Sequence, residues 1–252
     1  VHRKTPALLW LHDHDLGDIP PAVFSRYGKI LCLSEFHESS IASLYGIAAD
    51  RFARVANGID APVPDAGDRD PKAVVYASSP LRGLHILLEA WPQIVEAVPG
   101  ATLRVCYGWD IVDRIARDNQ EIRAKRDMVR SALRKCRGVS WMGRLPLPEL
   151  EKLLRRSGLL AYTCDGYPET FCTTVVRAGA CGTDVIASEG GAIRETAASL
   201  RIGVYDQTSV VGMVIEALRN PSPDWLRAQR SAAALSKYAW DRVVDGFFEW
   251  IR

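Results

Sequence analysis

Short apolar runs typical of β-strands alternate with amphipathic helical stretches along the whole chain of 252 residues. This alternation builds a parallel sheet with helices on its faces, because consecutive parallel strands need a crossover connection that is usually a helix. Most of the runs are apolar throughout, as strands buried on both faces should be. The sequence therefore predicts the α/β class, with strands expected at 7–11, 29–33, 73–78, 101–107, 139–142, 158–163, 184–187 and 202–205.

Three stretches indicate helices. Apolar residues recur at helical spacing after Gly83, and Pro99-Gly100 ends that pattern. The stretch 110–137 carries nine Lys or Arg and five Asp or Glu, which predicts one or two surface helices. A solvated face is the plain interpretation there, and contact with phosphate or an anionic membrane surface is the alternative. The tail from Pro221 onward predicts two helices, of which the last is too aromatic to stay undocked.

Turn-forming residues are densest between Asn57 and Asp70, which marks a linker. It divides a small lobe, residues 1–56, from a main domain, residues 57–235, and residues 236–252 form a C-terminal helix expected to pack back on the small lobe or on a partner. The chain opens on Val-His-Arg-Lys-Thr-Pro without an initiating Met, so we expect an upstream segment in a longer protein.

Charge and composition exclude several classes of protein. The 32 basic and 30 acidic residues nearly balance, so no strong field favours binding of nucleic acid. No apolar run reaches the roughly 18 residues of a membrane-spanning helix. The six cysteines contain no CxxC pair and have no His at zinc-site spacing, which favours reduced thiols in a cytoplasmic protein and no metal.

Functional residues are expected in the loops after the strands, because open parallel sheets bind ligands at the carboxyl ends of their strands. Three such loops carry polar or glycine-rich sequences at a helix start: 79–83, 165–172 and 188–191. Together they suit a diphosphate and a sugar. Each has a structural interpretation as well, since glycine is common in such turns and Glu169 could simply stabilise the first turn of a helix.

The segment Pro168-Glu169-Thr170-Phe171 resembles the signature that opens a helix in the donor domain of retaining glycosyltransferases of family 4, which have the GT-B fold. The stretches 76–84, 57–60 and 180–182 look like the same family. The resemblance implies a Rossmann-like main domain and a small lobe that is a partial acceptor-side lobe. It also implies transfer of a sugar, with retention, from a nucleotide sugar to a hydroxyl of a glycan, lipid or small molecule, without metal or cofactor.

The same resemblance assigns roles to single residues. Arg82 matches the cation that binds the donor diphosphate, and Glu169 matches the carboxylate that holds hydroxyls of the transferred sugar. His12 resembles an acceptor-lobe histidine that reaches that sugar, although a lone histidine can also be structural. The catalytic candidates are Glu169 and His12, and the donor-binding candidates are Ser79, Arg82, Gly83, Thr170, Phe171, Arg177, Gly190 and Gly191.

Two features depart from the family. Arg177 stands where the family usually has a second Glu, and a guanidinium has only hydrogen-bond donors. Its partner could be Glu169, a phosphate or an acidic sugar, or it could be a surface residue of a decayed site. The lobe before Asn57 is short, with two βα units, so an upstream region or a second copy could complete it. A catalytically weakened or inactive binding or scaffold module is therefore the alternative function, and an epimerase or phosphorylase of the same fold is a third.

Overall fold

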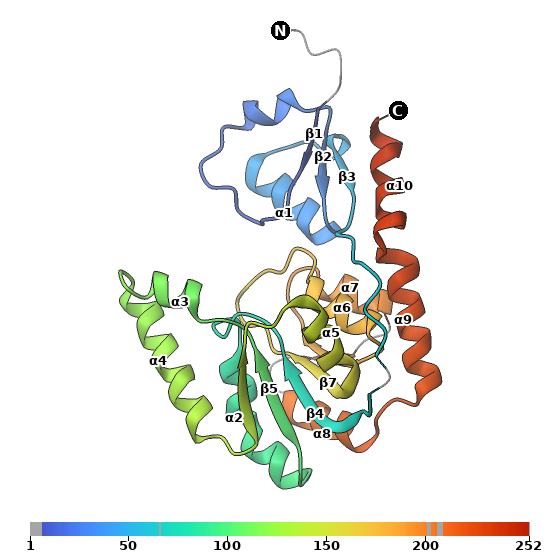
Figure 1. Ribbon diagram of the computed structural model, residues 1–252. Helices are drawn as coiled ribbons and strands as arrows, with labels where there is room; N and C mark the ends of the chain where they lie inside the picture. The colour runs from blue at the N-terminus through green and yellow to red at the C-terminus, as the bar shows by residue number, and fades with distance from the viewer. Residues whose placement is uncertain (1–6, 66, 201–202, 206–208, 252) are drawn as a thin grey trace.

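The computed structural model describes residues 7–65, 67–200, 203–205 and 209–251, which form two parallel sheets joined by the linker (Figure 1). All strand pairs that the structure records within the two sheets are parallel. The α/β class expected from the sequence is confirmed.

The large sheet has the strand order β6-β5-β4-β7-β8-β9. The chain enters at β4, continues to one side through β5 and β6, and then returns to build the other side. The order therefore reverses between β4 and β7, and at such a switch point the loops that leave the two strands diverge and open a crevice. The strand bounds are β4 Asp70–Tyr76, β5 Thr102–Cys106, β6 Val139–Gly143, β7 Ser157–Tyr162, β8 Asp184–Ser188 and β9 Gly203–Tyr205. Ile202, in the last expected strand, lies outside the described residues.

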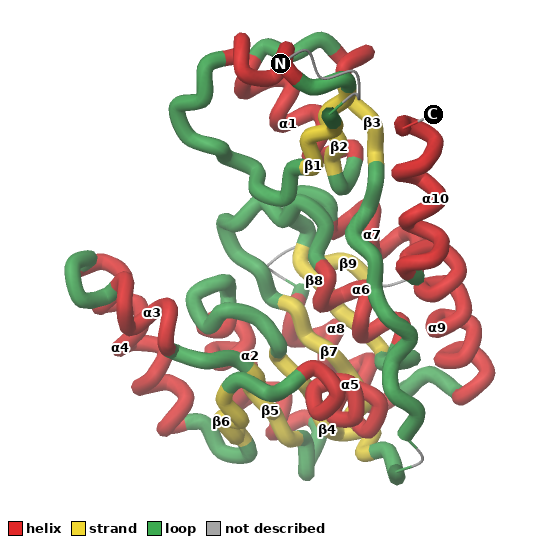
Figure 2. Tube along the Cα trace, turned by 45° about the horizontal axis from the view of Figure 1, so that its top comes forward, coloured by secondary structure: helices red, strands yellow, loops and turns green. Residues whose placement is uncertain are grey.

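Helices cover both faces of the large sheet (Figure 2). One face is covered by α2 (Leu84–Ala97), α4 (Gln120–Lys135) and α8 (Val210–Arg219), whose apolar residues pack with those of β4 and β5. The other face is covered by α5 (Leu147–Arg156), α6 (Thr173–Ala180), α7 (Ile193–Leu200) and α9 (Asp224–Tyr238). The helical pattern after Gly83 is α2, and the basic stretch contains α3 (Asp110–Ile115) and α4.

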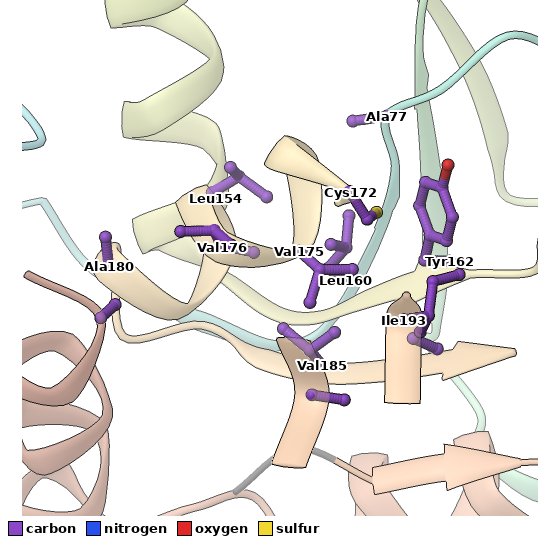
Figure 3. Packing of buried hydrophobic residues seen from close by; sticks show 14 of the residues in the cluster. Ala77, Leu154, Leu160, Tyr162, Cys172, Val175, Val176, Ala180, Val185 and Ile193 are labelled. Carbon is purple, nitrogen blue, oxygen red and sulfur yellow. The ribbon is translucent and has the colours of Figure 1, made fainter. Parts of the chain in front are cut away.

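The second of these two cores lies directly beneath the crevice. Val175 and Val176 of α6 pack with Leu160 of β7 and Val185 of β8, all of them buried (Figure 3). Tyr162 borders the same cluster at the end of β7, with its hydroxyl directed away from the apolar side chains. The loop between β7 and α6 is thus fixed from below by a close-packed apolar layer.

The small lobe is a parallel sheet of order β1-β2-β3, with β1 Leu8–Trp10, β2 Lys29–Cys32 and β3 Phe52–Arg54. It also holds two short 3-10 helices, η1 (Pro21–Arg26) and η2 (Ala49–Arg51). Helix α1 (Glu35–Tyr45) packs on one face of the sheet through Ile41 and Tyr45. Sequence analysis missed β3, because a strand of three residues that ends on Arg54 shows neither an apolar run nor an alternating pattern.

The C-terminal helix α10 (Trp240–Ile251) covers the other face of the small sheet, where Val243 and Phe247 contact Leu31 and Val55. It starts after a break at Ala239, where Ile59 of the linker donates a backbone hydrogen bond to Tyr238 (2.8 Å) and accepts one from Trp240 (3.2 Å). The last helix therefore begins four residues later than the expected boundary at 236.

Of the helices described, none combines the length and the apolar character that crossing a bilayer requires.

Gly83 joins the loops that follow β4 and β7. Its φ of +96° lies in the left-handed region, and a Cβ built on it would lie 1.5 Å from the carbonyl oxygen of Thr163. Thr163 in turn donates its hydroxyl to the carbonyl of Gly83 at 2.7 Å. Only glycine satisfies both the backbone conformation and the contact, so Gly83 sets the distance between the two loops at the crevice.

We predict that Gly83→Ala destabilises the protein by more than about 2 kcal/mol, because left-handed strain and displacement of the Thr163 backbone add together. Urea unfolding followed by circular dichroism measures the change. Gly212→Ala is the control, since Gly212 is exposed within α8 and a Cβ there meets nothing within 4 Å. That variant should gain about 0.5 to 1 kcal/mol from helix propensity. Equal stability of the two variants would contradict the close approach at Gly83.

Candidate active site

The carboxylate of Glu169 is the centre of the crevice between the loops after β4 and β7. Only 7% of the residue is exposed. Its Oε1 accepts hydrogen bonds from the hydroxyl of Tyr162 (2.5 Å) and from Nη1 of Arg82 (3.0 Å). Within the described residues both recorded hydrogen bonds end on Oε1, so Oε2 is open to accept a hydrogen bond from a ligand. A buried carboxylate with one engaged oxygen suits a neutral polyol.

Arg82 is held by two different contacts. Its guanidinium pairs with Glu169 and lies over the ring of Tyr167, 3.7 Å from the centroid. Burial by itself lowers the pKa of Arg82, but the charge of Glu169 and the neighbouring tyrosines raise the pKa above its ordinary value. The side chain is 36% exposed. Arg82 is therefore a fixed cation. Part of its guanidinium group stays exposed toward the crevice, where it suits a phosphate.

The glycine pair after β8 supports the Glu169 loop from behind. A Cβ on Gly191 would lie 2.3 Å from the carbonyl oxygen of Glu169, and the backbone N–H of Ala192 donates to that oxygen at 2.7 Å. Gly190 approaches the backbone of Tyr167. The structure thus places both glycines against the loop that carries Glu169 rather than on the cavity.

The residue after Glu169 connects the two lobes. Thr170 donates its hydroxyl to the carbonyl oxygen of His12 (2.9 Å), and the carbonyl oxygen of Thr170 accepts from the hydroxyl of Ser34 (2.8 Å). The His12 ring packs against Trp10, with centroids 4.5 Å apart. Buried His37 supports the same segment, since its Nε2 lies 2.9 Å from the carbonyl oxygen of Asp13.

Burial lowers the pKa of His37. Its Nδ1 accepts from the backbone N–H of Leu33 at 3.3 Å, so its Nε2 carries the proton and donates to Asp13. A neutral, fully buried histidine is structural here, and sequence analysis had no signal to separate it from His12.

A cavity of about 290 Å³ lies between these groups and is lined from both lobes. Of the residues expected at the site, it brings together His12, Ser79, Arg82, Glu169, Thr170 and Phe171. The start of α6 also lies on it, so the partial positive charge of a helix N-terminus borders the cavity. Cys172, from the expected loop 165–172, also lines it, as do residues that were not named as site candidates: Leu33, Asn57, Ala77, Ser78, Tyr107, Tyr162, Thr173 and Thr174.

Four expected residues lie off the cavity: Gly83, Arg177, Gly190 and Gly191. Tyr107 and Tyr162 could have been found from the sequence, because one follows β5 and the other ends β7, on the same edge of the sheet as Glu169.

Arg177 points away from the crevice and pairs with Glu151 of α5 at 2.5 Å. The side chains are 11% and 4% exposed, and the second oxygen of Glu151 accepts from the backbone N–H of Val63 in the linker at 3.1 Å. Both oxygens of Glu151 are thus engaged within the protein. The expected pairing of Arg177 with Glu169 is therefore wrong. The alternative that Arg177 is an exposed surface residue is wrong as well.

The cysteines near the crevice are protonated. Burial raises the pKa of Cys164 to about 11 and that of Cys172 further still. Cys172 is the one non-glycine residue with positive φ (65°) in the described ranges, at the turn into α6. Neither thiol suits nucleophilic chemistry. Among the residues with described positions, no three His, Cys, Asp or Glu side chains form a group that could hold a metal ion.

Residues 71–220 match the family model described as Glycosyl transferases group 1. The D-inositol 3-phosphate glycosyltransferase of Rhodococcus erythropolis (strain PR4 / NBRC 100887) is 25% identical over 274 residues, covering 94% of this chain and 58% of that protein. The corresponding enzymes of Rhodococcus opacus and Rhodococcus jostii are covered to 49% and 48%. The chain thus spans about half the length of the curated relatives it matches.

Solved structures share the fold at low identity. The crystal structure of Anabaena HepE in complex with UDP and glucose superposes with a TM-score of 0.69 at 16% identity, covering 97% of this chain and 71% of that chain. Sucrose-phosphate synthase from Thermosynechococcus elongatus gives 0.69 at 18% identity, covering 91% and 59%. Because the family model covers more than half of the chain, the chain belongs to the group 1 glycosyltransferases.

Proposed function

We propose that this chain binds a nucleotide sugar in the crevice between β4 and β7 and transfers the sugar, with retention, to a hydroxyl acceptor. The observation that carries the proposal is the pairing of Arg82 with Glu169, in which the cation keeps a free edge and the carboxylate keeps Oε2 free. One group suits the diphosphate and the other suits sugar hydroxyls. HepE, which shares the fold, was solved with UDP and glucose.

The geometry supports separate binding of the diphosphate and the sugar by different groups along the cavity. Arg82 and the N-terminal amides of α6 would stabilise the diphosphate as it leaves, since charge develops on its oxygens as the glycosidic bond breaks. Glu169 would orient the sugar by its hydroxyls. His12 lies on the small-lobe side, where it would meet the sugar from the acceptor direction. The leaving phosphate would assist deprotonation of the acceptor, so no metal or cofactor enters this scheme.

The remaining proposals concern the surroundings of the site. Residues 1–56 would act as part of the acceptor-side lobe, completed by an upstream region or by a second copy of the chain. The acceptor would be a glycan, a lipid or a small molecule, in a cytoplasmic protein that contacts the membrane surface at most peripherally.

Arg82→Ala should weaken nucleotide-sugar binding by about 1.5 to 3 kcal/mol, because a charge-assisted hydrogen bond to phosphate is lost. Calorimetry with UDP-, GDP-, ADP- and TDP-sugars measures the affinity and identifies the nucleotide. The matched control is Arg194→Ala, which breaks the exposed pair of Arg194 with Glu189 near the same edge. Unchanged affinity in Arg82→Ala would refute the assignment of the site.

A catalytically weakened or inactive binding module is the second candidate, and the orientation of Arg177 favours it. The position where the family usually has a carboxylate holds a cation that is committed to Glu151. Turnover of the donor by the purified chain separates the two candidates. Efficient transfer supports an enzyme with a different donor contact, and binding without turnover supports the module.

We predict that Arg177→Glu lowers the free energy of unfolding by about 3 to 5 kcal/mol, because it leaves Glu151 as a buried, unpaired charge facing a second carboxylate. The same substitution at Arg194, whose pair is 70% and 45% exposed, should change stability by about 1 kcal/mol or less. Chemical denaturation compares the two variants, and turnover is measured on the folded fraction. If Arg177→Glu instead kept its stability and gained turnover, Arg177 would be a substitution that impairs catalysis.

A further inference from the structure

A second polar cavity, of about 540 Å³, opens at the opposite edge of the large sheet, where the strands begin. It lies among the end of α5, the turn between α6 and β8, and α9. Arg69, Arg155 and Arg227 line it, each from a different segment of the chain. None of the chemistry assigned to the first cavity uses this edge.

Two of these arginines are rigidly placed by backbone carbonyl groups. Arg227 donates to the carbonyl oxygens of Gly182 (2.9 Å) and Arg155 (3.0 Å). Arg69 donates to the carbonyl oxygen of Gly158 at 3.1 Å and pairs with Asp184 at 3.2 Å. Their side chains are only 16% and 17% exposed. The two cations are therefore fixed in position beside the cavity.

Of the three arginines, Arg155 has the fewest recorded hydrogen-bond acceptors for its guanidinium N–H groups. Its Nε is buried and has no hydrogen-bond partner among the described residues. Its one recorded side-chain hydrogen bond is long, 3.4 Å from Nη2 to the carbonyl oxygen of Pro62. Nη1 of Arg155 likewise has no recorded acceptor among the described residues, so its N–H groups are available to an anion in the cavity that Arg155 lines.

The carboxylates around the cavity do not balance its cations. Asp184 is shared by Arg69 and Arg230, and Asp65 is taken up by Arg156. Asp224 is 97% exposed and lies 3.4 Å from Arg227. Of the described residues that line the cavity, three are arginines (Arg69, Arg155 and Arg227) and two are aspartates (Asp65 and Asp224).

The surroundings of Arg227 disfavour its charged form. Burial, and next the charge of Arg69, lower the pKa of Arg227. The cations are thus held together without full compensation, which is the electrostatic condition of an anion site.

We propose that this arginine cavity is a binding site for a phosphate group, supplied as the free ion or as a phosphomonoester, and that Arg155 and Arg227 are its main ligands. The planar, fixed guanidinium groups match the oxygens of a tetrahedral dianion. The proposal stands independently of the sugar-transfer site, because the two cavities lie at opposite ends of the same strands.

Titration calorimetry of the full chain with inorganic phosphate, at ionic strength held constant with sodium chloride, tests the site. Arg155→Gln should weaken phosphate binding about tenfold, the equivalent of a lost charge-assisted contact. Ala228→Asp is the second variant, since exposed Ala228 lines the cavity on α9 and its replacement adds a repelling charge without removing a native contact. It should weaken binding by a similar factor.

The controls are Arg134→Gln and Ala124→Asp, which make the same charge changes at exposed positions of α4. They should leave phosphate binding unchanged, and repeating the series in the Arg82→Ala background removes any phosphate bound at the first cavity. Parallel titrations with glucose 6-phosphate separate the two sources: tighter binding of the ester indicates a phosphorylated metabolite, and equal binding indicates the ion itself. Absence of phosphate binding in the Arg82→Ala background, or its retention there when either cavity substitution is added, would overturn the proposal.

Discussion

The loop that carries Glu169 and Thr170 is the constraint on which the site depends. The carboxylate of Glu169 is bound to Tyr162 and Arg82 of the main domain, and its backbone oxygen is bound to Ala192. The next residue, Thr170, holds the small lobe through both its hydroxyl and its carbonyl group. Because consecutive residues serve the two lobes, any shift of the loop would move the carboxylate and the lobe together. The cavity is therefore preorganised by the same contacts that join the lobes.

Among the described residues, Glu151 and Glu169 are buried carboxylates that each pair with an arginine, and the two pairs differ in whether both carboxylate oxygens are engaged. In the pair of Arg177 with Glu151 both carboxylate oxygens have donors within the protein, one of them a backbone N–H of the linker. No oxygen of Glu151 is left for a ligand, so that pair can only hold α5, α6 and the linker together. In the pair with Glu169 both donors converge on one oxygen, at the wall of a cavity. An open oxygen on a buried carboxylate is useful only when a ligand supplies the missing donor.

Much of the fold followed from local sequence patterns, and six of the ten expected site residues line one cavity. Of the nine strands in the described residues, eight were expected, as was the helix after Gly83, since periodicity and turn residues are local signals. Strand β3 has too few residues to show a pattern. The partner of Arg177 lies 26 positions away on another helix, and Gly191 acts through a backbone contact with Glu169. Such long-range contacts are set by the packing of helices on the sheet, which no local pattern encodes.

The two edges of the large sheet differ in the backbone groups that surround their arginines. At the carboxyl ends of the strands, the N-terminus of α6 adds partial positive charge to that of Arg82, so an anion is attracted from both sides. At the other edge, carbonyl groups of β7 accept hydrogen bonds from Arg69, and the C-terminus of α5 accepts one from Arg227. Carbonyl groups carry only partial charges, so they orient the guanidinium groups without neutralising them. Asp184 and Asp224 pair with Arg69 and Arg227, whereas Arg155 has no recorded carboxylate partner among the described residues, so its positive charge is left beside the cavity.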